Sequence, residues 1–300
     1  MPKNKGVLYA AVSYLCWGLL PIYWKALQHV GPLELMAHRV VWSLLLTLVL
    51  IIARGRLTLL LEALRNRRTL LVFAASAILL ATNWLVYIWG VQNGHVVETS
   101  LGYFINPLVN VLFGVLFLRE KLRVSQVVAI LLAAAGVLYL TFMYGKLPWI
   151  ALTLAGSFGI YGLLRKTATV GALEGLTLET LVMFVPAMGY LLFLESQGTA
   201  AFGHSGLFTT VLLMLAGVFT SVPLVLFAAG ARRINLTTLG ILQYIAPTLQ
   251  FLLGVFLYGE TLTRERMIGF VLIWCALLIY TGESLWRGHT TRAALAQQTT

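Results

Sequence analysis

Two apolar stretches of the chain each carry carboxamides and a proline at helical spacing. Residues 100–118 contain Tyr103, Asn106, Pro107 and Asn110 within an otherwise apolar run. On an α-helix, positions 103, 107 and 110 fall on one stripe. Because an unpaired amide in hydrocarbon costs several kcal/mol, this stripe must face protein or a water-filled cavity.

Residues 240–258 repeat the pattern 140 positions later, with Gln243, Pro247 and Gln250 in place of residues 103, 107 and 110. Polar, proline-broken helices at equivalent places in two halves of a chain indicate the central site of a transporter. Each proline removes a backbone donor, so we predict that Pro107 and Pro247 are bend points for alternating access. The alternative is that amides and prolines only adjust helix packing.

A third apolar stretch, residues 70–90, adds Asn83, Trp84 and Tyr87, and Asn83 and Tyr87 lie one helical turn apart. Aromatic walls with neutral amides suit small amphipathic or aromatic solutes. The alternative for a single Trp or Tyr is a place in the aromatic belt at the membrane interface. The sequence predicts a cavity with ten substrate-binding residues: Asn83, Trp84, Tyr87, Tyr103, Asn106, Asn110, Tyr161, Gln243, Tyr244 and Gln250.

Charged side chains inside apolar stretches are candidates for gating or coupling, because each is costly at the centre of a membrane helix. His38 and Arg39 share a depth with Glu98 near the predicted outer face. We expect Arg39 or His38 to pair with Glu98 and order the outer mouth. The alternative is that Arg39 reaches outward to the lipid head groups.

Glu179 lies near the inner end of another apolar stretch, at the opposite mouth from Arg39. Burial favours the protonated form of a carboxyl group, so Glu179 is a candidate proton carrier. The alternative is an ion pair at the inner face with a residue such as Arg165 or Lys166.

The composition is that of a polytopic membrane protein, because 60% of the 300 residues are hydrophobic and only 10% are charged. The chain contains no Asp, which excludes paired-Asp catalysis and Asp-based metal clusters. Cys16 and Cys275 lie far apart in apolar stretches and read as small hydrophobic residues. We therefore predict no catalytic residue, no metal and no cofactor.

Hydropathy predicts an all-α protein with ten membrane-spanning helices joined by short links. With the N-terminus inside, sixteen of the 21 Lys and Arg residues fall in inner segments and four in outer links. This bias predicts that both termini are cytoplasmic. It also explains the net charge of +11, because the excess Lys and Arg residues lie in the cytoplasmic segments next to the lipid head groups. We expect contact with the lipid bilayer and none with nucleic acid, and no feature specifies an oligomeric state. The predicted spans are residues 7–24, 35–53, 70–90, 96–118, 124–143, 148–164, 176–194, 207–229, 236–258 and 267–283.

The repeat extends to the start of each half, where residues 13–20 align with residues 157–164. Each half has five spans, an odd number, so the halves must be inverted across the membrane. We predict a first repeat at 1–143, a second at 144–283 and a mobile cytoplasmic tail at 284–300. Glu120 and Glu260 then fall at opposite faces, where each carboxylate is predicted to cap the helix that follows it.

Several motifs resemble those of the EamA-type drug/metabolite transporter superfamily, and most closely its RarD branch. They are REKL at 119–122, GETL at 259–262, HRVVWS at 38–43, NW at 83–84, YIWGVQN at 87–93 and SLGYFINPLV at 100–109. The resemblance covers nearly the whole chain. It implies ten helices in two inverted repeats, a place in the bacterial inner membrane and transport of small metabolites. Members of this branch are described as chloramphenicol-sensitivity proteins.

The residues and the resemblance together predict a secondary transporter that exports small metabolites or amphipathic drugs, with proton coupling as a hypothesis. No G-x-x-x-x-G-K-[ST] motif occurs, so ATP is not expected to drive transport directly. One alternative is a non-transporting interaction or sensor protein with a dry centre. The other is a membrane-embedded lipid-modifying enzyme, which would need clustered catalytic groups at one depth.

Overall fold

The computed structural model describes residues 3–92, 95–144 and 148–258, together with short pieces between 264 and 282. These residues form helices and no strand, as predicted. The last predicted span, 267–283, is described only in part, and the tail 284–300 lies outside the described residues. The helices are α1 (Lys3–Ala26), α2 (Pro32–Ala53), α3 (Leu57–Arg65), α4 (Arg67–Gln92), α5 (Val96–Leu118), α6 (Val124–Tyr144), α7 (Trp149–Thr167), α8 (Ala172–Ser196), α9 (Leu207–Ala231), α10 (Leu236–Gln243), α11 (Ile245–Leu252) and a π-helical turn at Leu253–Leu257.

Within the described residues, eight helical stretches are long and apolar enough to span a membrane: α1, α2, α4, α5, α6, α8, α9 and the combined run Leu236–Leu257. The chain is therefore a multi-pass membrane protein. α7 has 19 residues but is not among the eight. Its sequence WIALTLAGSFGIYGLLRKT contains three glycines and ends in a basic pair, which lowers its mean hydropathy.

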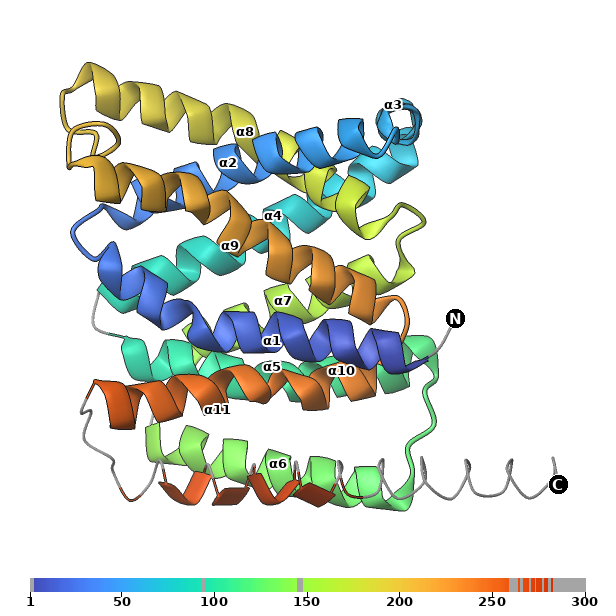
Figure 1. The fold of residues 1–300 in the computed structure, drawn as a ribbon. Helices are drawn as coiled ribbons and strands as arrows, with labels where there is room; N and C mark the ends of the chain where they lie inside the picture. Colours follow the sequence, from blue (N-terminus) through green and yellow to red (C-terminus); the bar gives the residue numbers. More distant parts are fainter. Residues whose placement is uncertain are drawn as a thin grey trace, which may run out of the picture.

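The long helices run back and forth across a single bundle (Figure 1). The links α1–α2 and α8–α9 lie at one end of the bundle, and the links α7–α8 and α9–α10 lie at the other. The short helix α3 crosses the second end and buries Leu60 and Ala63 against the bundle. An amphipathic helix in this place fits the membrane interface.

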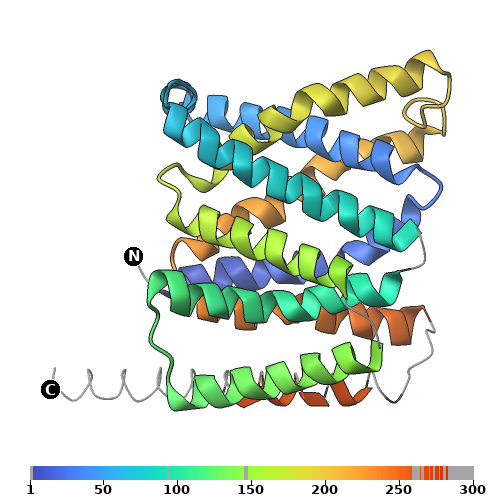
Figure 2. The same ribbon diagram turned by 180° about the vertical axis from the view of Figure 1, so that it is seen from behind.

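The two predicted repeats interlock through helix pairs. α1 packs against α9 and α11, α2 against α8 and α9, and α5 against α7 and α10. Figure 2 shows α7 lying beside α4 and α5. Small residues allow some of these contacts. A Cβ on Gly217 would lie 2.5 Å from the Trp42 backbone, and one on Gly240 would lie 2.6 Å from the Pro107 carbonyl oxygen.

The proline of the second repeat coincides with a helix break. α10 ends at Gln243, and the Tyr244 amide donates to the Ile241 carbonyl in a tighter turn before α11 begins. Pro247 has no N–H to donate to the Gln243 carbonyl, so the regular ladder cannot continue there. In α5 the helix continues past Pro107.

Glu120 caps a helix, but not the one that the sequence predicted. α5 ends in a left-handed residue, Arg119 (φ 53°), and the chain then turns. The Glu120 carboxylate accepts hydrogen bonds from the amides of Leu236 (2.6 Å) and Thr237 (3.0 Å). It therefore caps α10 of the second repeat rather than the following helix α6. The other predicted capping residue, Glu260, lies outside the described residues.

Candidate functional site

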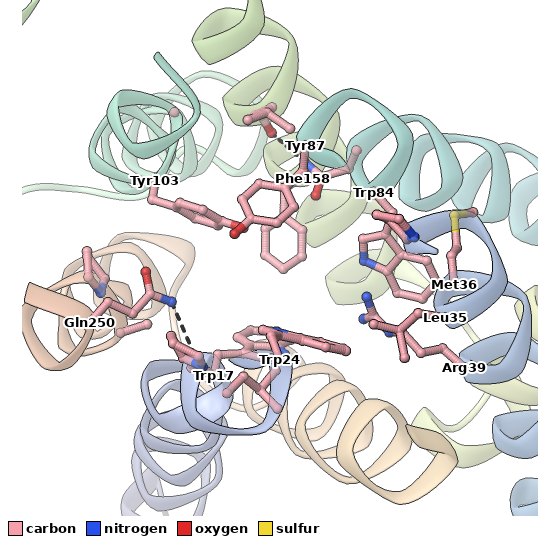
Figure 3. A pocket seen from close by; sticks show the side chains of 18 of the residues that line it. Trp17, Trp24, Leu35, Met36, Arg39, Trp84, Tyr87, Tyr103, Phe158 and Gln250 are labelled. Carbon is pink, nitrogen blue, oxygen red and sulfur yellow. Dashed lines mark hydrogen bonds between the residues drawn. The ribbon is translucent and has the colours of Figure 1, made fainter. Parts of the chain in front are cut away.

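A cavity of about 380 Å³ lies at the junction of the two predicted repeats. Its walls come from α1, α2, α4, α5, α7, α9, α10 and α11, and Figure 3 shows labelled side chains around it. The volume falls in the range of small-molecule sites. The cavity brings together seven of the ten predicted substrate-binding residues: Asn83, Trp84, Tyr87, Tyr103, Asn106, Gln243 and Gln250.

Aromatic rings form much of the cavity wall. Tyr87 and Tyr103 meet edge to face with ring centroids 5.8 Å apart, and Trp17 and Phe158 do so at 5.6 Å. Trp17, Trp24 and Phe158 also line the cavity, and none of them is among the ten predicted residues. A signal for two of them was present, because residues 17, 21 and 24 have the same spacing, with a central proline, as 103, 107 and 110.

The amides of the two polar stripes point inward, and several hold helices together. Asn110 Nδ2 donates to Gln243 Oε1 at 2.8 Å, which joins α5 to α10. Gln250 Nε2 donates to the Trp17 carbonyl at 3.2 Å. Asn83 Nδ2 donates to the Leu154 carbonyl at 2.9 Å. Asn106 and Gln243 also line the cavity and contribute polar groups to its wall.

Three predicted substrate-binding residues do not line the cavity: Asn110, Tyr161 and Tyr244 are fully buried beside it. Asn110 is occupied by its bond to Gln243. The Tyr161 ring stacks on Phe227, with centroids 5.8 Å apart. The Tyr244 hydroxyl donates to the Phe104 carbonyl at 3.2 Å. Each of the three side chains packs in a contact between helices. In this structure they therefore support the residues of the cavity wall and do not line the cavity themselves.

Arg39 lies in the cavity wall, with its guanidinium against aromatic rings. Its guanidinium carbon is 4.1 Å from the centre of the Trp84 ring and 4.9 Å from that of Trp24. Its Nε donates to the Thr220 hydroxyl at 3.0 Å. The predicted partner, Glu98, has a side chain outside the described part of the chain, so the pairing stays a prediction.

His38 points away from the cavity, toward the α8–α9 link. Its Nε2 is 3.8 Å from Glu34 Oε1, and its ring lies against Phe202 with centroids 5.0 Å apart. Glu34 is also buried and accepts a hydrogen bond from the Ala201 amide at 2.7 Å. His38 and Glu34 thus tie α2 to the link between α8 and α9.

Glu179 sits in a buried polar cluster between α4, α7 and α8. Arg165 Nη1 is 3.7 Å from Glu179 Oε1, Ser76 donates to the same oxygen, and the Tyr161 hydroxyl is 3.5 Å from the other oxygen. The ion pair with Arg165, which the sequence left open, is present. Lys166 instead donates to the carbonyls of Ala231 and Ile234.

The described residues contain no group of three or more His, Cys, Asp or Glu side chains able to hold a metal ion. The described lining residues of the cavity likewise include no nucleophile beside a general base. Its chemistry is that of a binding site, with aromatic faces, neutral amides and one guanidinium.

Comparison with known proteins gives the family. The model of the EamA-like transporter family matches residues 4–142 and again residues 147–282. The chain is 47% identical to a protein named RarD from Streptomyces exfoliatus, over 98% of this chain and 93% of that protein. It is also 47% identical to the uncharacterized transporter YojE of Bacillus subtilis (93% and 94% covered).

A more distant relative, the chloramphenicol-sensitive protein RarD of Pseudomonas aeruginosa, is 30% identical over 94% of this chain and 95% of its own length. A solved crystal structure with 20% identity superposes with a TM-score of 0.71, over 92% of this chain and 98% of that one. That likeness supports the fold alone. The double family match and the full-length relatives show that the chain belongs to the EamA-like transporter family.

Proposed function

We propose that this chain is a secondary transporter of the bacterial inner membrane that exports small amphipathic solutes. Two inverted five-helix repeats, residues 1–143 and 144–283, would supply ten spanning helices and expose the cavity alternately to each side. Chloramphenicol-type drugs are one candidate class, because a relative is named for chloramphenicol sensitivity. The proposal gives the chain no catalytic role.

The observation that carries the proposal is the cavity of about 380 Å³ lined by both polar, proline-containing stripes. Tyr103 and Asn106 enter it from α5, and Gln243 and Gln250 enter it from α10 and α11. A sensor protein with a dry centre has no need of such a space. A site shared by two repeats is what alternating access requires, because each repeat must contact the solute in both states.

The direction in which the cavity extends supports assigning this conformation to an outward-facing state. It extends to Gln28 and Val30 in the α1–α2 link, at the end predicted to lie outside. Toward the other end, the rings of Tyr14, Tyr161 and Phe227 are fully buried and pack together. We infer that this aromatic cluster closes the inner passage and that it separates when the cavity opens to the cytoplasm.

The proposal includes coupling to protons through Glu179. This carboxyl group is fully buried beside the aromatic cluster, in contact with Tyr161. Protonation would remove its attraction to Arg165, 3.7 Å away, and so loosen the contact between α7 and α8. Coupling to protons requires a titratable group whose charge changes with the state of the gate, and a buried carboxyl group can serve as one.

Transport by purified protein in proteoliposomes tests the proposal. We expect flux of labelled chloramphenicol or of other small amphipathic solutes, and we expect an imposed pH gradient to accelerate it. Tyr103→Ala should reduce the flux, because it removes an aromatic wall of the cavity. Phe142→Ala is the matched control, because Phe142 is 76% exposed on the outside of the bundle. Flux no greater than in empty liposomes for every solute, or equal flux in both variants, would contradict the proposal.

A further inference from the structure

Arg39 is the only charged residue in the described wall of the cavity. The other lining residues are apolar, aromatic or carry neutral amides and hydroxyls. A guanidinium within a membrane-spanning helix is costly unless a partner or water compensates its charge. The position of Arg39 therefore calls for an explanation beyond packing.

The protein contacts of Arg39 leave the end of its guanidinium available. The Nε atom donates to the Thr220 hydroxyl at 3.0 Å, and the guanidinium carbon lies 4.1 Å from the centre of the Trp84 ring and 4.9 Å from that of Trp24. Among the described residues, neither terminal nitrogen has a hydrogen-bond acceptor. Figure 3 shows this end of the side chain directed into the hollow between the two tryptophans. Contacts with two aromatic rings hold a guanidinium in place without using its terminal nitrogens, which stay available to a ligand.

The acid nearest to Arg39 along α2 is turned elsewhere. Glu34 precedes Arg39 by five residues, which places the two side chains roughly 140° apart around a helix. Its carboxylate is buried at the α8–α9 link, where it accepts from the Ala201 amide at 2.7 Å. The described part of the cavity wall therefore carries a positive charge without a protein carboxylate to neutralise it.

We propose that the solute of this cavity is a small organic anion, a carboxylate with an aromatic or apolar body, and that Arg39 binds its carboxylate. This inference rests on the proposed transport function and names the substrate class of the same site. A carboxylate offers two oxygens in the geometry of the guanidinium edge, so both terminal nitrogens can donate. Tyr87, Tyr103, Trp17 and Phe158 provide ring faces for the body of the solute. A neutral amphipathic drug would use these rings alone.

Three ligands that differ mainly in charge can measure how much the negative charge of the solute contributes to binding. The probes are 3-phenylpropionate, its neutral amide and the corresponding phenylpropyl ammonium ion, which share one ring and chain. Binding to the purified full-length protein can be followed by tryptophan fluorescence, because Trp17, Trp24 and Trp84 line the cavity. We expect the carboxylate to bind at least about tenfold more tightly than the amide, as for a hydrogen bond to a charged group. The ammonium ion should bind most weakly.

Arg39→Gln should weaken binding of the carboxylate by about 10- to 100-fold and leave that of the amide unchanged. Arg39→Lys should restore part of the preference, because it keeps the charge but not the bidentate geometry. Arg67→Gln is the matched control, because it removes one positive charge from an exposed position in α4. If Arg39→Gln does not fold, the comparison of the three ligands on the wild-type protein still shows whether the cavity prefers a carboxylate.

Equal binding of carboxylate and amide by the wild-type protein would overturn the inference, as would no binding of the carboxylate. Equal binding is the result expected if Glu98 neutralises Arg39. Flux measurements separate this failure from failure of the transport proposal. If both ligands cross proteoliposomes equally and Arg39→Gln changes neither rate, transport stands and the anion inference fails. If the carboxylate binds selectively but no solute crosses, the binding chemistry stands and the transport proposal fails.

Discussion

The buried pair of Glu179 and Arg165 offers a direct test of how charge is held in this bundle. The two side chains are 0% and 2% exposed, and Arg165 Nη1 lies 3.7 Å from Glu179 Oε1. Arg165 also donates to the Ala172 carbonyl at 2.7 Å, while its Nε and Nη1 have no hydrogen-bond partner among the described residues. Glu179→Gln, Arg165→Gln and the double variant remove one charge, the other charge and both.

The distance between Arg165 Nη1 and Glu179 Oε1 sets the expected loss of stability in each variant. At 3.7 Å and an effective dielectric constant of about 20, the attraction between two unit charges is about 4.5 kcal/mol. Removing one charge also leaves its partner buried without compensation, so we expect each single variant to lose about 3–5 kcal/mol of stability. The double variant leaves no uncompensated charge. It should therefore lose much less than the sum of the two single losses.

Equilibrium unfolding in mixed micelles measures these losses. A single variant that loses less than about 1 kcal/mol would show that the pair is screened by water, as exposed pairs are. Additive losses in the double variant would show that the two charges do not interact, and either result would refute the reasoning.

The double variant Glu179→Gln/Arg165→Gln also gives a clearer transport experiment than Glu179→Gln alone. In the single variant, a loss of proton coupling could not be separated from a loss of stability. We expect the double variant to bind solute but to show no acceleration by a pH gradient. If the gradient still accelerates flux, Glu179 is not the proton carrier.

Three further predictions concern the contacts that join the repeats, each measured as the free energy of unfolding in the same micelles. Glu120→Gln should cost about 1–2 kcal/mol, because it removes the negative charge at the N-terminus of α10 and replaces an acceptor oxygen with a donor. Gly240→Ala should cost about 1–3 kcal/mol, because its Cβ would lie 2.6 Å from the Pro107 carbonyl oxygen, a backbone atom that cannot rotate away. Asn110→Leu should cost about 1–2 kcal/mol through loss of the bond to Gln243.

Each of these variants has a control with a distinct outcome. Glu62→Gln changes an exposed carboxylate of α3 and should leave stability unchanged, so an equal loss in both would rule out capping by Glu120. Gly189→Ala places its Cβ in open space within α8 and should be neutral or stabilising. Gln243→Leu removes the same hydrogen bond as Asn110→Leu, so the double variant Asn110→Leu/Gln243→Leu should lose less stability than the sum of the two single losses. Additive losses would exclude the bond as their cause.

Properties that depend on residues close together in the chain could be predicted from the sequence. The predicted span 96–118 coincides with α5, because hydropathy and helical periodicity are local. The inward direction of the amide stripes also followed locally, since a carboxamide in hydrocarbon needs a partner. The helix break at Tyr244 lies three residues before Pro247, where the missing N–H interrupts the ladder.

Only the tertiary structure decided which inward-facing groups reach the cavity. Asn110 and Tyr103 share one stripe of α5, yet Tyr103 lines the cavity and Asn110 is consumed by a contact with α10. Glu120 caps a helix as predicted, but not the predicted helix, because the amides that donate to its carboxylate lie 116 and 117 residues away in the chain.

Arg39 and Glu179 show the same division. The sequence identified both as costly charges within spans, but it could not say what surrounds them. In the structure Arg39 faces the cavity between two tryptophans, and Glu179 faces Arg165. The hydrophobic pattern of a helix fixes which face turns inward, whereas the partner that meets each inward group is set by how distant helices pack, which leaves no mark in the local sequence.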